Sequence, residues 1–185
     1  MLFLSQKALK TASSKGLSYP RDLPMMALLK SKEFLMLKEG QKAPDFLLDD
    51  DRGKKVSLKD AKGKNLVLYF YPKDMTPGCT QEACDFRDNW SAVQKKGALV
   101  WGVSADAVKR HQSFKEKYKL PFPLLSDESF KMLKAYGVWK KKKFMGREFM
   151  GIIRTTIIID KSGKIKKIWS PVRVKNHVHE VLENL

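Results

Sequence analysis

The chain is poor in the residues that build metal centres, because its 185 residues include only 2 cysteines and 3 histidines. A structural zinc site takes four such ligands at close spacing, and these histidines are scattered relative to the cysteines. We therefore expect no metal and no other cofactor. His111 lies on the apolar face of a predicted helix and should be a packing residue, whereas His177 and His179 should be exposed to solvent.

Acidic residues are also scarce, with 20 Asp and Glu against 37 Lys and Arg, a formal net charge of +17. A strong positive charge can attract nucleic acid or anionic membranes. The lysines are spread along the chain, densest at Lys140–Lys143, rather than gathered on a known nucleic-acid motif. We therefore expect no specific nucleic-acid partner. No apolar run is long enough to span a membrane, and no internal repeat is visible.

Acidic residues are missing altogether from the first 21 positions, which carry four basic residues and several serines. That composition is typical of transit peptides, although only Arg21 supplies arginine. A disordered extension and a start codon assigned too far upstream are alternatives. We favour a cytoplasmic protein with a loosely ordered extension over residues 1–36, followed by one domain over residues 37–185, and keep an organelle address as the alternative.

Both cysteines lie in one segment, YPKDMTPGCTQEACDF, which runs from Tyr71 to Phe86. The preceding run, NLVLYFYP, is short, apolar and rich in aromatics, which predicts a buried strand. Thr76-Pro77-Gly78 is typical of a helix start, with a hydroxyl N-cap followed by proline. Cys79 then falls in the first turn, where free N–H groups and the helix dipole stabilise an anion such as a thiolate.

Helical spacing predicts which way each cysteine points. Cys79 lies near the centre of an apolar stripe, so its sulfur should face the core; the stripe consists of Ala83, Phe86, Trp90 and Val93. Cys84 lies about 140° further round, nearer to solvent. Their Cα atoms would be about 8.6 Å apart in an intact helix, beyond the roughly 7 Å that a disulfide allows. The pair can therefore bond only if the helix start unwinds.

A family resemblance rests on these residues. The pattern P-x-x-x-T-x-x-C, here Pro72, Thr76 and Cys79, resembles the peroxiredoxin active-site motif. The longer form TPGCTQEACDFRD is similar to the peroxiredoxin Q subfamily, also called bacterioferritin comigratory protein. The resemblance covers residues 37–185 and includes EGQKAPDFLLDD, GVSAD, LPFPLLSDE and GVWKKKKFMGREFMGIIRTTIIID.

The resemblance implies a role for each matching residue. Cys79 would be the peroxidatic cysteine and Cys84 the resolving cysteine. Thr76 would hydrogen-bond the peroxide and the sulfur, and Pro72 would shield the site from water. Arg154 matches the family arginine that favours the thiolate and orients the peroxide. The residues themselves support this, because a lone cation beside the strand TTIIID is unusual for a core and suits an anion.

Backbone groups complete the expected site, since the N–H groups of Gly78 and Cys79 could face the peroxide. The implied function is a thiol-dependent peroxidase that reduces hydrogen peroxide and alkyl hydroperoxides in antioxidant defence and redox homeostasis. Cys79 would become a sulfenic acid, Cys84 would form the disulfide, and thioredoxin or a similar dithiol protein would reduce it. The family leans toward monomers. The alternative is a redox-sensing or holdase-like interaction protein that uses the same switch without fast turnover.

The order of predicted elements indicates the fold. Strands are expected at ALVWGVSAD and PLLSD, and helices over residues 106–118 and 129–138. RTTIIID and KIKKIWSP should form a hairpin that turns at Lys161-Ser162-Gly163, and the final ten residues should form a helix. This order is that of a thioredoxin-like α/β fold, with a central mixed sheet flanked by helices in a single domain.

Overall fold

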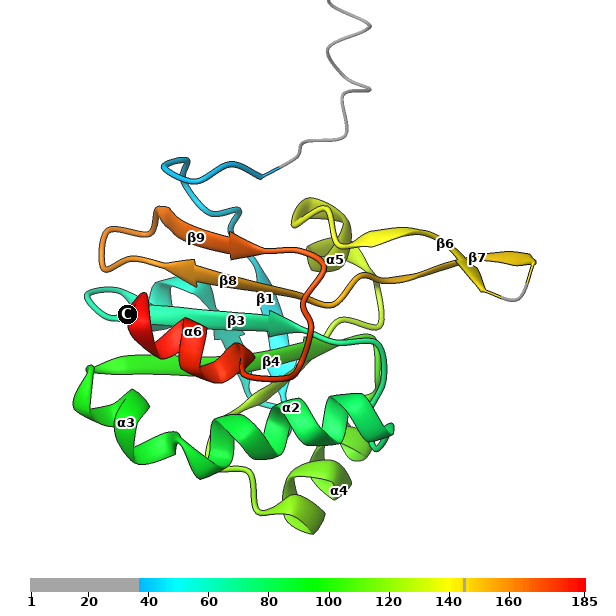
Figure 1. Ribbon diagram of the computed structural model, residues 1–185, viewed down its shortest axis with the longest axis horizontal. Helices are drawn as coiled ribbons and strands as arrows, with labels where there is room; N and C mark the ends of the chain where they lie inside the picture. The colour runs from blue at the N-terminus through cyan, green and yellow to red at the C-terminus, as the bar shows by residue number, and fades with distance from the viewer. Residues whose placement is uncertain (1–36, 145) are drawn as a thin grey trace, which may run out of the picture. The chain divides into compact units, whose positions relative to one another are not determined.

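The computed structural model describes residues 37–144 and 146–185, which belong to one compact unit (Figure 1). The predicted extension over residues 1–36 lies outside the described residues, so the division of the chain at residue 37 stays a prediction. Within the described ranges, no helix combines the length and the apolar character needed to cross a membrane.

A mixed seven-stranded sheet forms the centre of this unit, in the order β2-β1-β5-β4-β3-β8-β9. Strands β3, β4 and β5 run parallel, and the remaining pairings are antiparallel. Parallel neighbours need crossover connections, which the helices supply. The bounds are β1 Leu47–Asp50, β2 Lys55–Ser57, β3 Asn65–Phe70, β4 Ala98–Ser104, β5 Leu124–Ser126, β8 Thr155–Ile159 and β9 Ile165–Trp169.

Helices cover both faces of the sheet, as Figure 1 shows. Strand β3 alternates between the two sides: Val67 and Tyr69 join one apolar cluster, and Leu66 and Leu68 join the other, as the two-residue period of a strand requires. The first cluster includes side chains of α2, α3, α4 and α6; the second includes those of α5 and the 3-10 helix η1. The bounds are α2 Pro77–Asp88, α3 Trp90–Lys95, α4 Val108–Tyr118, α5 Lys131–Ala135, α6 His177–Glu183 and η1 Leu58–Ala61.

The predicted α/β order, with a central mixed sheet flanked by helices, is confirmed. One predicted helix is divided, because the apolar stripe expected in a single helix runs through α2 and then α3, with the break at Asn89. The stripe still faces inward: Phe86 and Val93 are fully buried, and Trp90 packs against the same cluster.

A separate two-stranded hairpin projects from the body of the unit (Figure 1). It consists of β6 (Trp139–Phe144) and β7 (Arg147–Ile152), paired antiparallel. Its base is fixed in the core, since Ile152 is buried and the Trp139 ring packs 4.4 Å from the ring of Phe130. The sequence pattern does not predict this hairpin and shows only a basic run there.

The two buried histidines differ in how well they were predicted. His111 is a packing residue, as expected: it is fully buried and its Nδ1 lies 2.8 Å from Asp74 Oδ2. The exposure expected for His177 is wrong. His177 is 2% exposed, its Nε2 lies 2.7 Å from Thr156 Oγ1, and the ring packs edge-on to Trp169. α6 begins at His177 and turns this residue toward the sheet, whereas His179 is exposed.

Candidate active site

The candidate site lies where α2 begins, just beyond the carboxyl end of β3. Thr76 is the N-cap residue with an extended backbone, Pro77 is the first helical residue, and the N–H of Thr80 donates to the carbonyl of Thr76 at 2.8 Å. Cys79 is therefore in the first turn, as the sequence predicted. Backbone N–H groups in a first turn have no intrahelical acceptor, so those of Gly78 and Cys79 remain available to an anion.

Cys79 points into the protein, with only 1% of its surface exposed, and joins the cluster beneath α2. Gly78, next to it, is exposed and borders a hollow of about 410 Å³ between the start of α2 and the chain leading into α6. A small molecule can therefore approach the first turn from solvent, while the sulfur itself stays among apolar side chains.

Arg154 meets Cys79 directly, because its Nη2 donates to Sγ at 3.2 Å across 75 positions of sequence. The sheet explains this contact. Phe70, the last residue of β3, pairs with Thr155, the first residue of β8. The chain that leaves β3 and the residue that precedes β8 therefore lie at the same end of the sheet. The cation beside the strand TTIIID thus contacts the thiol, as the sequence predicted.

Glu82 is a member of the site that the sequence analysis missed. Its carboxylate is fully buried, and Oε2 accepts a hydrogen bond from Nη1 of Arg154. Burial raises the pKa of Glu82 to about 7, although Arg154 opposes this shift. The available signal was spacing, since Glu82 follows Cys79 by three residues and must share its buried face.

Arg154 is the charge that links the two groups. Burial by itself would lower the pKa of Arg154, but Glu82 and Cys79 raise it, and the net direction is upward. The guanidinium therefore stays protonated and uses its two terminal nitrogens as a fork, one toward the carboxylate and one toward the sulfur. Among the described residues, the other oxygen of Glu82, Oε1, is buried without a hydrogen-bond partner.

Thr76 and Pro72 lie on the loop between β3 and α2. The Thr76 hydroxyl donates to the carbonyl of Lys73 at 3.0 Å rather than capping the helix. Its oxygen lone pairs remain free to accept a hydrogen bond. Pro72 is exposed at the start of the loop. Their expected roles toward a peroxide stay predictions.

Cys84 lies five residues, or about 1.4 turns, further along the same helix and is partly exposed, as expected. Both cysteines are free thiols, and α2 is helical from Pro77 to Asp88. Burial raises the pKa of the Cys84 thiol, and Asp88 and Asp85 add to this, while Arg87 opposes it. Cys84 is thus held as a neutral thiol while the helix is intact.

A buried polar cluster fixes the position of the loop between β3 and α2. Asp74 is fully buried, its Oδ1 accepts from Tyr71 Oη at 2.7 Å, and its Oδ2 lies 2.8 Å from His111 Nδ1. The N–H of Asp74 donates to Asp106 Oδ2 at 2.8 Å. Asp74, three positions before the first residue of α2, is therefore held by hydrogen bonds to three other residues.

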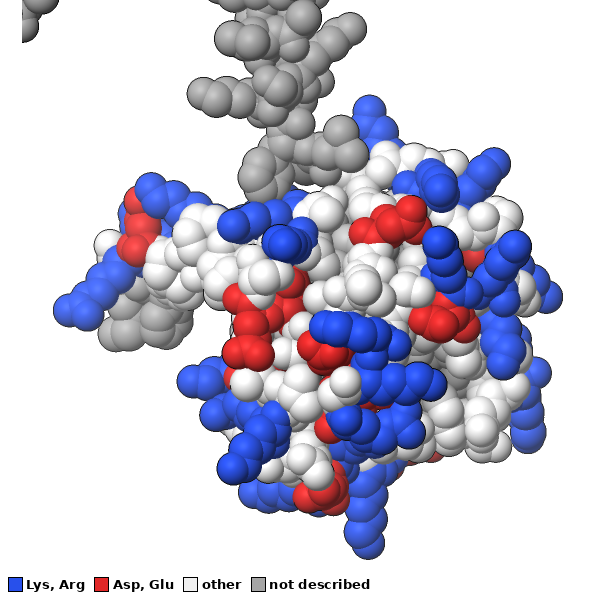
Figure 2. Space-filling model, turned by 180° about the vertical axis from the view of Figure 1, so that it is seen from behind, with Lys and Arg blue, Asp and Glu red and all other residues white. Residues whose placement is uncertain are grey.

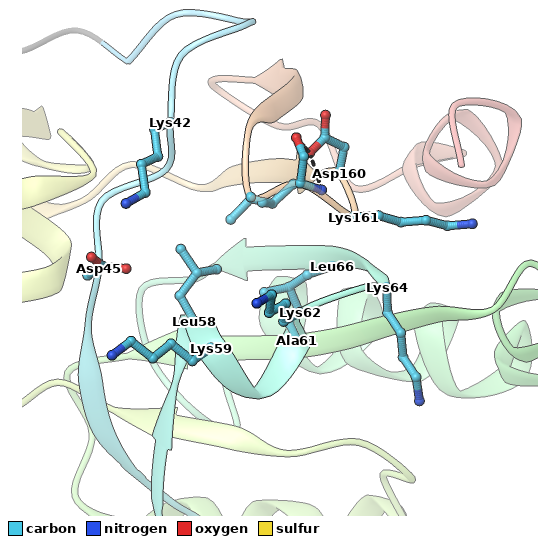
Figure 3. Close-up of a pocket in the computed structure, with 13 residues that line it drawn as sticks. Lys42, Asp45, Leu58, Lys59, Ala61, Lys62, Lys64, Leu66, Asp160 and Lys161 are labelled. Carbon is cyan, nitrogen blue, oxygen red and sulfur yellow. Dashed lines mark hydrogen bonds between the residues drawn. The ribbon is translucent and has the colours of Figure 1, made fainter.

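The cavity drawn in Figure 3 is a different place. It measures about 300 Å³ and lies between η1 and the β8–β9 turn, with Leu66 and Ile159 in its wall and several lysines around it. Leu66 is near the start of β3 and Ile159 ends β8, so the cavity is at the opposite end of these strands from Cys79. Lys64 and Lys161 point away from it (Figure 3).

A buried thiol at a helix N-terminus, contacted by an arginine and accompanied by a second cysteine, defines a cysteine-based redox site on an α/β fold. The chain belongs to the AhpC/TSA family, whose model matches residues 39–168, and within it to the peroxiredoxins of the Bcp or peroxiredoxin Q type. It is therefore a peroxidase that takes its electrons from a thiol reductant, and the thioredoxin-like fold expected from the sequence is confirmed.

Three relatives carry this assignment. Peroxiredoxin Bcp of Bacillus subtilis is 55% identical over 146 residues, which is 79% of this chain and 93% of the relative. A putative peroxiredoxin bcp of Coxiella burnetii is 52% identical over 151 residues, or 82% of this chain and all of the relative. The structure of the Xanthomonas campestris bacterioferritin comigratory protein matches with a TM-score of 0.74 and 37% identity, covering 80% and 94% of the two chains.

Proposed function

We propose that Cys79 is the peroxidatic cysteine and Cys84 the resolving cysteine of this peroxidase. The observation that carries the proposal is the 3.2 Å contact between Arg154 Nη2 and Cys79 Sγ in the first turn of α2. A guanidinium donates to this sulfur in the first turn of a helix, an environment that is typical of nucleophilic cysteines. The pKa of the Cys84 thiol is instead raised, chiefly by burial, although Arg87 opposes the shift.

In the first step, the Cys79 thiolate attacks one oxygen of the hydroperoxide. An S–O bond forms and the O–O bond breaks. The sulfur is oxidised to a sulfenic acid, and the other oxygen leaves with the bonding electrons and takes a proton, so water or an alcohol departs. Arg154, together with the N–H groups of Gly78 and Cys79, donates hydrogen bonds toward the two oxygens.

The acceleration comes mainly from stabilising the charge that develops on the leaving oxygen. One preorganised donor aimed at such a charge is typically worth about 3 kcal/mol. Glu82 acts through Arg154: its buried carboxylate accepts from Nη1 and so directs Nη2 toward the sulfur. Thr76 would accept a hydrogen bond from the peroxide O–H, and Pro72 would limit the entry of water.

In the second step, Cys84 attacks the sulfenic sulfur, the S–O bond breaks, water leaves and the Cys79–Cys84 disulfide forms. Because both residues lie on one intact helix, the start of α2 must unwind first. A dithiol protein, which we propose to be thioredoxin, then exchanges with the disulfide and restores both thiols. We propose hydrogen peroxide and alkyl hydroperoxides as substrates; the Xanthomonas campestris relative has been studied for alkyl peroxide reduction. A monomeric state and a cytoplasmic location stay predictions.

Steady-state turnover tests the proposal. Thioredoxin, its reductase and NADPH should support continuous consumption of hydrogen peroxide by the wild-type chain. Cys79→Ser should abolish consumption, and Cys84→Ser should react once and then stop. Rapid oxidation of Cys79 without turnover by any dithiol reductant would favour the alternative role, a redox-sensing interaction protein. Full activity in Cys79→Ser would overturn the assignment.

A further inference from the structure

The β6–β7 hairpin is the most unusual surface feature outside the thiol site. Its strands and turn carry five basic residues and one acidic residue, Glu148; the basic ones are Lys140, Lys141, Lys142, Lys143 and Arg147. Figure 2 shows these basic side chains on the projecting lobe at the left of that view. Two-stranded ribbons are marginally stable by themselves in water, so a ribbon kept outside the core suggests contact with something else.

Large apolar side chains accompany the lysines. Phe149 and Met150 are each 48% exposed, and with Leu47 and Met75 they are the exposed large apolar side chains among the residues whose burial the structure describes. The pairing places Lys142 opposite Phe149 and Lys141 opposite Met150. Successive residues of a strand face opposite sides, so Phe149 shares one side of the ribbon with Lys140 and Lys142, and Met150 shares the other side with Lys141 and Lys143.

We propose that the β6–β7 hairpin docks on the surface of an anionic phospholipid bilayer. A ribbon that enters the headgroup layer edge-on meets lipid on both sides, which suits basic and apolar groups on both of its faces. Binding of this kind combines buried apolar area with attraction to anionic lipids.

Nucleic acid fits the hairpin less well. A duplex groove would contact one side of the ribbon and leave the lysines and the apolar residue of the other side in water. The basic residues are also mostly lysines, which act as point charges, whereas the recognition of base edges favours the planar fork of arginine.

The position of the hairpin links docking to the thiol site. β7 ends at Ile152, two residues before Arg154, and α2 begins at the same right-hand end of the unit in Figure 1. Docking would therefore bring the end of the unit that holds the thiol site toward the bilayer. The docking itself does not depend on the peroxidase mechanism, so the two can fail separately.

Cosedimentation of the full chain with vesicles tests the proposal. Vesicles of phosphatidylcholine with about 30% phosphatidylglycerol should bind the protein at physiological salt, and pure phosphatidylcholine should not. Lys141→Gln with Lys143→Gln should weaken binding at least about tenfold, since each lysine near an anionic surface contributes measurably. Phe149→Ser with Met150→Ser should weaken it similarly, with hydrogen peroxide turnover unchanged in both variants.

Matched controls separate the hairpin from general charge, because basic residues cover much of the surface (Figure 2). Lys59→Gln with Lys62→Gln removes the same charge near the distant cavity of Figure 3, and Leu47→Ser removes another exposed apolar residue. Both should bind vesicles as the wild type does. Equal losses in the Lys59/Lys62 control would overturn the proposal, as would absence of vesicle binding together with hairpin-dependent binding of a duplex oligonucleotide.

Discussion

Cys79 and Cys84 occupy one unbroken helix, five residues apart, with the first sulfur buried and the second partly exposed. Helical geometry keeps their Cα atoms about 8.6 Å apart, too far for a disulfide. The helical conformation is therefore the one that attacks peroxide. The Cys79–Cys84 disulfide requires a different conformation of the same segment. The stability of the first turn of α2 then controls the rate at which the disulfide forms.

Strengthening that turn should slow disulfide formation without slowing the attack on peroxide. Gly78→Ala is suited to this test, because an added Cβ would lie 3.5 Å from Arg154 Nη2, an ordinary contact. Alanine favours helix over glycine by about 1 kcal/mol, which predicts about fivefold slower disulfide formation. Rapid-quench alkylation with mass spectrometry measures both steps. Ser91→Ala, in α3, is the control and should change neither; equal slowing of both steps by Gly78→Ala would contradict the account.

The resolving step should speed up as pH rises above neutrality. Burial raises the pKa of the Cys84 thiol in the intact helix, and an exposed cysteine titrates near 8.5, so its thiolate is scarce near pH 7 before and after the helix start unwinds. Thiolate is the attacking form. Quenched-flow measurement of disulfide formation from pH 6 to pH 10 should show this rise. A rate independent of pH across that range would indicate that unwinding alone limits the step.

Removing Glu82 should slow the reaction of Cys79 with peroxide. Glu82→Ala removes the buried carboxylate that accepts a hydrogen bond from Arg154. We expect about tenfold slower oxidation of Cys79, which is less than the typical effect of removing one oriented hydrogen-bond donor completely. Glu82→Gln keeps an acceptor oxygen and should recover part of the rate. Because the pKa of Glu82 is raised to about 7, the wild-type rate should increase through pH 7 as the carboxylate ionises, and this inflection should vanish in Glu82→Gln.

The control for Glu82 is Asp85→Asn, which removes a half-buried carboxylate from the same helix. Stopped-flow competition for peroxide gives all four rates. An inflection near pH 7 that persists in Glu82→Gln would exclude Glu82 as its source.

His177 should make the fold less stable in acid. Burial lowers the pKa of His177 to about 4, and Arg154 adds to the effect, whereas a histidine in the unfolded chain titrates near 6.5. Between these values the unfolded state binds more protons, so stability falls as pH drops from about 6.5 toward 4. The fall in Tm from pH 7 to pH 4.5 should be smaller in His177→Gln than in the wild type. The control is the exposed residue His179, and His179→Gln should show the same fall in Tm as the wild type. A smaller fall in Tm for His179→Gln would contradict the assignment of the effect to His177.

Asp74 should be essential to stability. Removing one partner of a buried hydrogen bond typically costs about 1–3 kcal/mol, because the other group is left unsatisfied, and Asp74 is the partner of both Tyr71 and His111. Asp74→Ala should lower the free energy of unfolding in urea by that amount. Asp88→Ala, which breaks the exposed pair with Arg87, should change it little. A small effect of Asp74→Ala would mean that water or the neighbouring hydroxyl replaces the carboxylate.

The helix start and the orientation of Cys79 could be predicted because they depend on local rules. A Thr-Pro pair at a helix start and a 3.6-residue period are properties of a few adjacent residues, although the Thr76 hydroxyl donates to the Lys73 carbonyl rather than capping the helix. Glu82 and His177 were not predicted correctly, because each is buried through a partner far away in sequence. Arg154 lies 72 positions from Glu82, and Thr156 lies 21 positions from His177. Composition alone assigns such polar residues to solvent.

The hairpin was missed for another physical reason. Strand β6 contains Lys140–Lys143, so it lacks the alternation of apolar and polar residues by which a half-buried strand is recognised. The strand conformation of β6 comes from backbone pairing with β7, and such pairing cannot be recognised from the hydropathy of the side chains.

A non-reducing peptide map tests the central claim most directly. Reduced protein receives one equivalent of hydrogen peroxide, is alkylated within seconds and is digested for mass spectrometry. The account predicts a peptide with a Cys79–Cys84 linkage in the wild type and no linkage in Cys79→Ser. Two alkylated thiols in the peroxide-treated wild type would contradict it, because they would mean that Arg154 and the helix start do not activate Cys79.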